Sequence, residues 1–301
     1  MPWLLTSSPA NNERVFCYTE GMILTELFQG VSIAQLAIVA FGLGVIIGSF
    51  LNVYIYRFHT GKSLSGSSHC LSCGAPLAWY DLFPLLSYLG LRGRCRQCGC
   101  KIPARYFLVE LMTGLLFAGA LSITTDVLAL CILWFIFSVM VVITVYDYYH
   151  FIIPDSLTLT LLAAVSALVG YQWFISDGSL AEIAVAIAAA LAGSAFFLAL
   201  WLISKGAWLG FGDVKLAVPL GLLVGATQVF SFVVLSFWIG AGVSLFILGL
   251  AWLLERGKHH LQLPELGLTM KSAVPFAPFM VASSLAIIFT HFNALALFSF
   301  F

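Results

Sequence analysis

Long stretches without a charged residue constrain this chain more than any other feature of its sequence. No Asp, Glu, Lys or Arg occurs in four stretches that each hold one apolar segment: 27–56, 127–146, 156–176 and 183–204. A helix needs about 20 apolar residues to cross a hydrocarbon core roughly 30 Å thick. Because 61% of the residues are hydrophobic and only 9% are charged, a soluble domain could not bury so much apolar surface.

Further apolar segments bring the expected number of membrane-spanning helices to about eight. The uncharged stretch 216–254 is interrupted at 225–228, which predicts two helices with a tight turn between them. One more helix is expected at 106–125, with Glu110 near the membrane interface, and another at 273–291. Runs this continuous are typical of helices and not of barrel strands, because backbone groups in lipid must be satisfied within the segment. The sequence therefore predicts an all-α polytopic membrane protein.

The expected organisation has four parts. They are an external or interfacial segment at 1–30, a first membrane helix at 31–56, a cytoplasmic cysteine module at 57–105, and a membrane domain with helices 2–8 at 106–301. The first segment lacks the basic and apolar regions and the cleavage site of a signal peptide. Small residues at Gly44 and Gly48, and along the alanine-rich stretch 183–200, predict close helix packing.

Basic residues predict the orientation of the chain, because cytoplasmic loops retain Lys and Arg. With the amino terminus outside, twelve of the thirteen basic residues lie on the cytoplasmic side and only Arg14 lies outside. The inverted topology would reverse these numbers. We therefore expect the ends of the first, third, fifth and seventh helices to face the cytoplasm.

Two C-x2-C pairs, Cys70/Cys73 and Cys95/Cys98, dominate the polar module. Their spacing is close to that of zinc ribbons, in which four thiolates hold one Zn²⁺ tetrahedrally. A structural metal is a common way to stabilise a module of this size. Two disulfides are the alternative, which the reducing cytoplasm disfavours. Cys100 is an additional thiol that could compete as a ligand.

Two aspartates at the edges of predicted helices are candidates for catalysis, because acidic residues there are energetically expensive. Asp147 ends the third helix and Asp213 opens the sixth, so both face the cytoplasm in the predicted topology. Two carboxyl groups at the same depth can share one proton and act as general base and general acid on a scissile peptide. No metal is required for that reaction.

The residues around these aspartates allow other interpretations. Asp155 follows a proline and precedes an apolar run, which is typical of a helix start. Gly210 and Gly212 remove side-chain bulk next to Asp213, so an extended peptide could approach closely. Alternatively, Asp213 could cap a helix and pair with Lys215.

Several motifs in their order along the chain resemble the type IV prepilin peptidases, a branch of the G-x-G-D membrane aspartyl proteases. The motifs are GSFLNV at 48–53, the two C-x2-C pairs, LRGRC at 91–95, Pro154-Asp155 after Asp147, and GFGDVK at 210–215. The chain departs from the family pattern at Leu71 and Tyr149, neither of which is a reacting group. The resemblance covers most of the chain.

This resemblance implies a specific activity and site. Asp147 and Asp213 would be the catalytic pair, supported by a turn with Gly210, Gly212 and Lys215, and the enzyme would remove a basic leader from prepilins or pseudopilins. Such enzymes commonly also methylate the new amino terminus with S-adenosylmethionine. No Rossmann glycine fingerprint locates the methyl donor, so only Glu110 and the first cytoplasmic loop are candidates for its site.

The expected partners are therefore prepilins or pseudopilins and the lipid bilayer, with no nucleic acid; the oligomeric state is left open. A transporter with intramembrane carboxylates is the alternative function. The positions of Asp147 and Asp213 at helix ends disfavour it, because transporters bind their ions near the membrane midplane. A zinc-ribbon scaffold is a third possibility, which would leave the G-x-G-D turn unexplained.

Overall fold

The structure is a computed structural model that describes residues 30–58, 66, 68–256 and 274–294. The predicted external segment lies outside the described residues, apart from Gly30. Within them the chain is helical, and its only strand-like features are two isolated β-bridges in the cysteine module.

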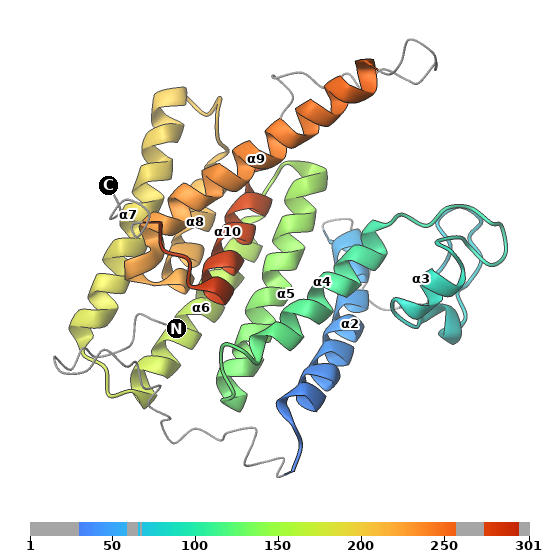
Figure 1. Ribbon diagram of the computed structural model, residues 1–301, viewed down its shortest axis with the longest axis horizontal. Helices are drawn as coiled ribbons and strands as arrows, with labels where there is room; N and C mark the ends of the chain where they lie inside the picture. The colour runs from blue at the N-terminus through green and yellow to red at the C-terminus, as the bar shows by residue number, and fades with distance from the viewer. Residues whose placement is uncertain (1–29, 59–65, 67, 257–273, 295–301) are drawn as a thin grey trace. The chain divides into compact units, whose positions relative to one another are not determined.

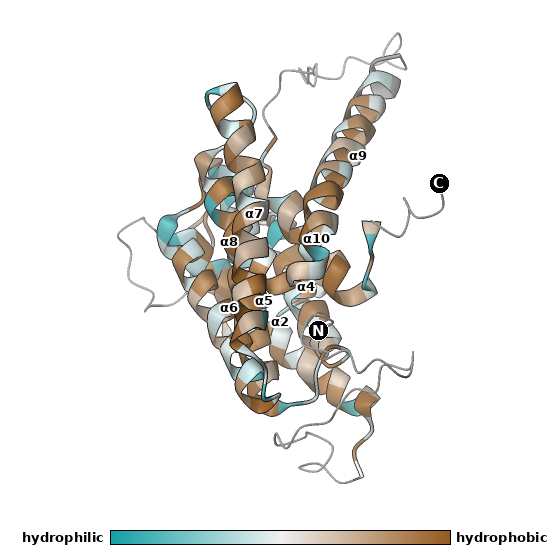
Figure 2. Cartoon of the chain, turned by 90° about the vertical axis from the view of Figure 1, so that its left-hand side faces the viewer, coloured by the Kyte–Doolittle hydropathy of each residue, from teal (hydrophilic) through white to brown (hydrophobic). Residues whose placement is uncertain are grey.

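Eight helices coincide with the eight apolar segments (Figure 1). Their bounds are α2 Ile33–Arg57, α4 Arg105–Ala120, α5 Val127–His150, α6 Asp155–Ile175, α7 Leu180–Ser204, α8 Phe211–Val224, α9 Val229–Arg256 and α10 Ala277–Thr290. Three short helices accompany them: η2 Trp79–Leu82, α3 Leu86–Gly90 and η3 Ala226–Gln228. Among the described residues, five helical segments are long and apolar enough to cross a membrane, whereas α4, α8 and α10 are shorter. The long helices are hydrophobic over most of their surface (Figure 2).

The predicted break inside the long uncharged stretch is confirmed. Gly225 has φ of 85°, a conformation that glycine adopts without a steric penalty, and it ends α8. The 3₁₀ turn η3 follows directly and leads into α9. The chain therefore reverses between two helices at the point where the apolar pattern is interrupted.

The described residues form two compact units. The cysteine unit contains 30–142 and 170–175, and the aspartate unit contains 143–169 and 176–294, with the gaps given above. Helices α5 and α6 contribute residues to both. All the candidate catalytic residues lie in the aspartate unit, and all the candidate metal ligands lie in the cysteine unit.

In the cysteine unit, glycines bring α2 and α4 into close contact, as the sequence predicted. A Cβ placed on Gly44 would lie 2.7 Å from the carbonyl oxygen of Thr113, and one on Gly48 would lie 2.8 Å from Cα of Glu110. Gly114 of α4 faces α2 in the same way, because its Cβ would lie 2.6 Å from Cγ2 of Val45. The backbones of the two helices are thus too close to admit larger side chains at these points.

Small residues of α7 play the same role in the aspartate unit. A Cβ on Gly221 of α8 would lie 3.2 Å from Cα of Ala190, and one on Gly193 would lie 2.6 Å from a methyl carbon of Val229. The hydroxyl of Ser194 donates a hydrogen bond of 2.8 Å to the carbonyl oxygen of Val214 in α8. This contact fixes the first turns of α8, where Asp213 lies.

Candidate active site

Asp147 lies near the end of α5 with only 5% of its surface exposed. Its Oδ2 accepts a hydrogen bond of 3.2 Å from the backbone N–H of Ala277, the first residue of α10. The first N–H groups of a helix have no partner within the helix, and their partial positive charge attracts a carboxylate. Pro278 suits the first turn of α10 for the same reason, since proline has no N–H to leave unpaired.

Asp213 lies in the first turn of α8 and is 6% exposed. Its Oδ2 accepts a hydrogen bond of 3.1 Å from the backbone N–H of Gly210, while its own N–H donates to the carbonyl oxygen of Gly210 at 3.1 Å. These two hydrogen bonds join Gly210 and Asp213 in both directions and so stabilise the turn. The Asp213 carboxyl group is thereby held by the glycine-bearing turn that precedes the helix.

The glycines of this turn are needed for space. A Cβ on Gly212 would lie 3.1 Å from Cβ and 3.4 Å from Cδ1 of Ile153, which precedes α6. A Cβ on Gly210 would lie 3.3 Å from the Oδ2 of Asp213. Side chains at either position would press on the segment before α6 or on the carboxyl group itself.

The fold brings Asp147 and Asp213 close enough to interact electrostatically, although they lie far apart in the sequence. Both are buried in the same unit, and each accepts a hydrogen bond from a backbone amide. Two carboxyl groups that come close together can share one proton, because like charges disfavour ionisation of both. Such a pair can supply a base and an acid for hydrolysis.

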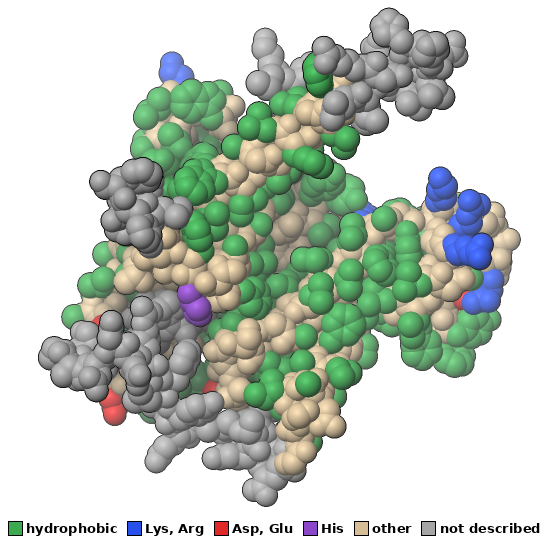
Figure 3. All heavy atoms as spheres, in the orientation of Figure 1, with side chains coloured by type: hydrophobic (Ala, Val, Ile, Leu, Met, Phe, Trp, Pro, Cys, Tyr) green, Lys and Arg blue, Asp and Glu red, His purple; other side chains and the backbone are tan. Residues whose placement is uncertain are grey.

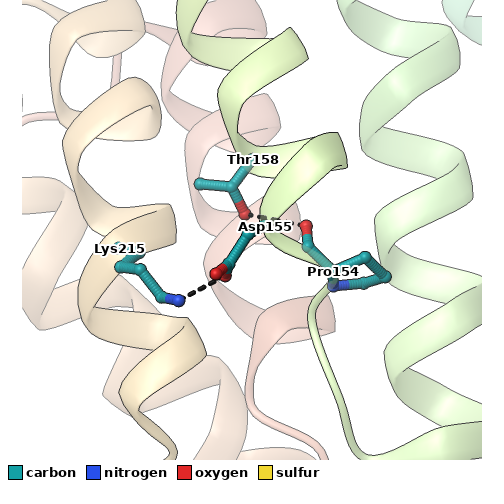
Figure 4. A network of polar contacts seen from close by, with 4 residues as sticks. All are labelled: Pro154, Asp155, Thr158 and Lys215. Carbon is teal, nitrogen blue, oxygen red and sulfur yellow. Dashed lines mark hydrogen bonds and ion pairs between the residues drawn. The ribbon is translucent and has the colours of Figure 1, made fainter.

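The interpretation of Asp213 as a helix cap is confirmed, because its carboxyl group accepts the N–H of the N-cap residue Gly210, but its predicted pairing with Lys215 is wrong. Instead, Lys215 of α8 forms an ion pair with Asp155, the first residue of α6, as Figure 4 shows. The lysine also lies over the ring of Phe211, 5.2 Å from its centre. Asp155 begins α6 as predicted, and its exposed carboxylate is engaged by the lysine, whereas Asp213 is buried.

The cysteine module places a compact group of thiols in the other unit. Four sulfur atoms lie within 4.8 Å of one another, those of Cys70, Cys95, Cys98 and Cys100. Lys and Arg side chains gather on the surface of the module (Figure 3). The backbone N–H groups of Cys73 and Ser72 lower the pKa of the Cys70 thiol to about 6, which favours the thiolate that metals bind.

Cys73, the fourth ligand in the sequence-based prediction, is adjacent to this group. Its side chain hydrogen-bonds with the thiols of Cys70 and Cys98. Cys100 lies closer than expected, with its sulfur 3.1 Å from that of Cys98 and 3.6 Å from that of Cys70. Four thiols therefore surround one centre that can bind a metal such as zinc, and Cys73 is a fifth thiol next to them.

Sequence reasoning missed one polar group of the site, the backbone amide at Ala277. A backbone donor has no residue type that would single it out. The Pro275-Phe276-Ala277-Pro278 segment is nevertheless a signal for a helix start, because proline is common in the first turn.

Comparison with known proteins identifies the family of this chain. Residues 134–245, which contain both aspartates, match the Type IV leader peptidase family, and residues 43–124 match the Bacterial Peptidase A24 N-terminal domain. A "Prepilin leader peptidase/N-methyltransferase" of Burkholderia pseudomallei is 32% identical over 277 residues, covering 82% of this chain and 83% of that protein. The chain belongs to the type IV leader peptidase family.

Other relatives with the same name extend the match across this leader peptidase. One from Aeromonas hydrophila is 31% identical over 294 residues, covering 86% of the chain and 91% of that protein. One from Myxococcus xanthus is 44% identical over 133 residues, covering 44% of the chain and 40% of that protein. No solved structure matches the chain.

Proposed function

We propose that this leader peptidase is a membrane aspartyl endopeptidase that removes the basic leader from type IV prepilins or pseudopilins at the cytoplasmic face of the inner membrane. One observation carries the proposal: Asp147 and Asp213 are buried in one helical unit, each accepts a backbone N–H, and their charges interact. The family membership and the names of the relatives support the same substrate class.

The two carboxyl groups would divide the reaction between them. The ionised partner takes a proton from a water molecule while the water oxygen bonds to the carbonyl carbon of the scissile peptide. The protonated partner donates a hydrogen bond to the carbonyl oxygen, whose developing negative charge it stabilises. When the carbon–nitrogen bond breaks, the amine leaves with a proton from the acid partner, and the pair returns to sharing one proton.

The substrate chemistry fits the predicted orientation. A basic leader is attracted to the anionic cytoplasmic leaflet, and the apolar helix that follows it lies in the bilayer. Helical peptides resist proteolysis because their backbone is not extended. A glycine at the junction disfavours the helix there, so the peptide can extend toward the turn at Gly210 and Gly212 at little energetic expense.

We also propose that the enzyme methylates the new amino terminus, as the names of its relatives indicate. S-adenosylmethionine, when bound, would supply the methyl group that this amine takes up. The cysteine module would hold a structural zinc through Cys70, Cys95 and Cys98 together with Cys73 or Cys100. This metal would stabilise the module and would not enter the peptidase reaction.

Replacement of each aspartate tests the peptidase. The chain is expressed with a type IV prepilin, and leader removal is followed by the shift in pilin mass. We expect Asp147→Asn and Asp213→Asn each to lower cleavage by about a thousandfold or more, since a shared proton needs two carboxyl groups.

Asp177→Asn is the matched control. Asp177 is exposed in the loop before α7 and has φ of 47°, a conformation that asparagine tolerates. This variant should cleave at the normal rate. Full cleavage by either the Asp147 or the Asp213 variant, at equal expression, would exclude the aspartyl mechanism.

A further inference from the structure

The cysteine unit contains a cavity of about 620 Å³ that the peptidase reaction does not use. Its walls come from the second half of α2, the first half of α4 and the cysteine module. This volume lies within the range of small-molecule sites, roughly 300–1,000 Å³. The polar side chains that bear on a ligand include Asn52, Arg57, Tyr88, Arg96, Tyr106 and Glu110, and the lining also contains Asp81, Lys101 and the thiols of Cys70, Cys95 and Cys100.

The charged group that lies deepest in this wall is the Glu110 carboxyl, which is only 9% exposed. Its Oε2 accepts a hydrogen bond of 2.8 Å from the backbone N–H of Leu85, and the hydroxyl of Ser49 donates a second. Both partners are donors, which fits a carboxylate. A buried carboxylate is energetically expensive, so a cationic ligand beside it would be strongly favoured.

Leu85 shows that this arrangement is held under strain. Its φ is 58° and its ψ is −50°, a conformation that residues with side chains rarely adopt. That backbone conformation directs the amide of Leu85 at Glu110. A purely structural tie between the module and α4 would explain the bond, but it would explain neither the strain nor the cavity that Glu110 borders.

The rest of the wall complements a ligand with a flat ring and a carboxylate. The rings of Tyr88 and Tyr106 offer surfaces for stacking and for attraction to a cation. Arg57 and Arg96 also line the cavity, and guanidinium groups bind carboxylates well. Arg96 also forms an ion pair of 2.8 Å with Asp81, and Arg57 is the candidate partner for the ligand's carboxylate. Asn52, which is 6% exposed, donates its side-chain N–H to the carbonyl oxygen of Tyr106 at 3.0 Å and so fixes the wall between α2 and α4.

We propose that this cavity is the binding site of the methyl donor, with the Glu110 carboxylate beside the sulfonium of S-adenosylmethionine. The donor combines the three features that the wall complements: a positive sulfur, an amino-acid carboxylate and a purine ring. This inference rests on the methyltransferase part of the proposed function and not on the peptidase part.

Binding to the purified full-length chain in lipid nanodiscs tests the site without any turnover. Isothermal titration calorimetry compares two non-reactive analogues. S-adenosylhomocysteine has a neutral sulfur, and an amine analogue of the donor carries a positive charge at that position. We expect the charged analogue to bind wild type about tenfold more tightly, as a charge-assisted contact would give.

Glu110→Gln should remove this preference, so that the two analogues bind with similar affinity. Glu182→Gln, a matched change in the first turn of α7 in the other unit, should leave the preference unchanged. Val53→Phe adds bulk to the cavity wall on α2 and keeps the Glu110 carboxyl group, and it should weaken the binding of both analogues at least tenfold. Val53→Phe thus still tests the site if Glu110→Gln does not fold.

The Asp147→Asn/Asp213→Asn double variant separates the two proposals. It should lose leader cleavage and keep the affinity of wild type for both analogues. A wild-type chain that cleaves prepilin but binds neither analogue would overturn the inference and leave the peptidase intact. Three other results would also overturn it. Val53→Phe could bind both analogues as tightly as wild type, or Glu110→Gln could prefer the charged analogue as strongly as wild type does. A leader peptide could also displace both analogues from the wild-type chain.

Discussion

Asp147 and Asp213 each accept a hydrogen bond from a backbone amide at or next to a helix start. Such donors have fixed positions, because the helix that carries them determines where they point. The carboxyl groups are therefore oriented by the starts of α10 and α8 and not by flexible side chains. Orientation of this kind is what a proton-sharing pair requires, since small displacements alter the interaction between two charges.

Gly212→Ala tests how tightly the turn is packed. The added Cβ would lie 3.1 Å from that of Ile153, so Ile153 or the start of α8 must give way slightly. We expect leader cleavage to fall by about tenfold or more, because catalysis is sensitive to displacements below 1 Å. The measurement is the cleavage rate of purified protein on a prepilin peptide. Gly242→Ala in α9, where a Cβ meets nothing within 4 Å, should cleave normally; equal rates for both variants would contradict the packing argument.

The five thiols of the module lead to a distinct prediction about metal binding. Cys70 and Cys95 are the most buried, with 9% and 7% exposed, and we expect Cys70→Ser and Cys95→Ser to lose the metal. Cys73→Ser and Cys100→Ser should each keep about one zinc per chain, because four thiolates remain within reach of a tetrahedral site. The Cys73→Ser/Cys100→Ser double variant should lose it.

Zinc content by elemental mass spectrometry of the purified chain checks this prediction, with Cys131→Ser as the control. Cys131 lies in α5, apart from the thiol group. Loss of zinc from the Cys73 variant alone would restore the two C-x2-C pairs as the ligand set. Loss from the Cys100 variant alone would assign the fourth position to Cys100.

At the scale of the helices, small residues determine which elements can approach each other. The backbones of α2 and α4 meet at glycines, and α7 meets α8 at alanine and glycine. In lipid there is little hydrophobic force between helices, so close van der Waals contact stabilises their association. The cavity wall and the start of α8 both depend on these contacts.

Gly48→Ala should weaken the α2–α4 pair. The added Cβ would lie 2.8 Å from Cα of Glu110, a backbone atom that cannot rotate away. We expect the free energy of unfolding to fall by about 1–3 kcal/mol, as overpacking of a helix contact typically gives. Unfolding in sodium dodecyl sulfate, followed by circular dichroism, measures the change.

Gly42→Ala is the paired control on the same helix. Its Cβ meets nothing within 4 Å, and alanine favours a helix by about 1 kcal/mol over glycine. This variant should be as stable as wild type or more stable. A stability loss shared by both variants would mean that helix propensity, and not the contact with α4, determines the result.

At the scale of the whole molecule, the orientation in the membrane stays a prediction from the basic residues. It places the end of α5 and the start of α8 on the cytoplasmic side, where prepilin leaders are found. The helices between these points agree with it, since α6 and α7 are each long enough to cross the membrane and return the chain to the same side.

Reporter fusions test this orientation. Alkaline phosphatase fused after Asp177, between α6 and α7, should be active because the fusion point faces the periplasm. Alkaline phosphatase fused after Lys205, between α7 and α8, should be inactive. Green fluorescent protein should fluoresce when fused after Lys205 and not when fused after Asp177. A reversed pattern would place the two aspartates on the wrong side for the proposed reaction.

The sequence by itself determined the helical class, the positions of the eight helices and the break at 225–228. These follow from local properties, because the length of an uncharged apolar run and the presence of glycine act within a single segment. It also brought Asp147, Asp213 and the paired cysteines forward as candidates, since charged and metal-binding residues are conspicuous in so apolar a chain.

Only the tertiary structure decided which groups meet. The pairing of Lys215 with Asp155, the amide of Ala277 at Asp147, the proximity of Cys100 and the cavity beside Glu110 all join residues far apart in sequence or depend on backbone direction. A sequence pattern alone does not give the distance between two helices. Helix packing sets those distances, and with them which buried carboxyl groups can interact.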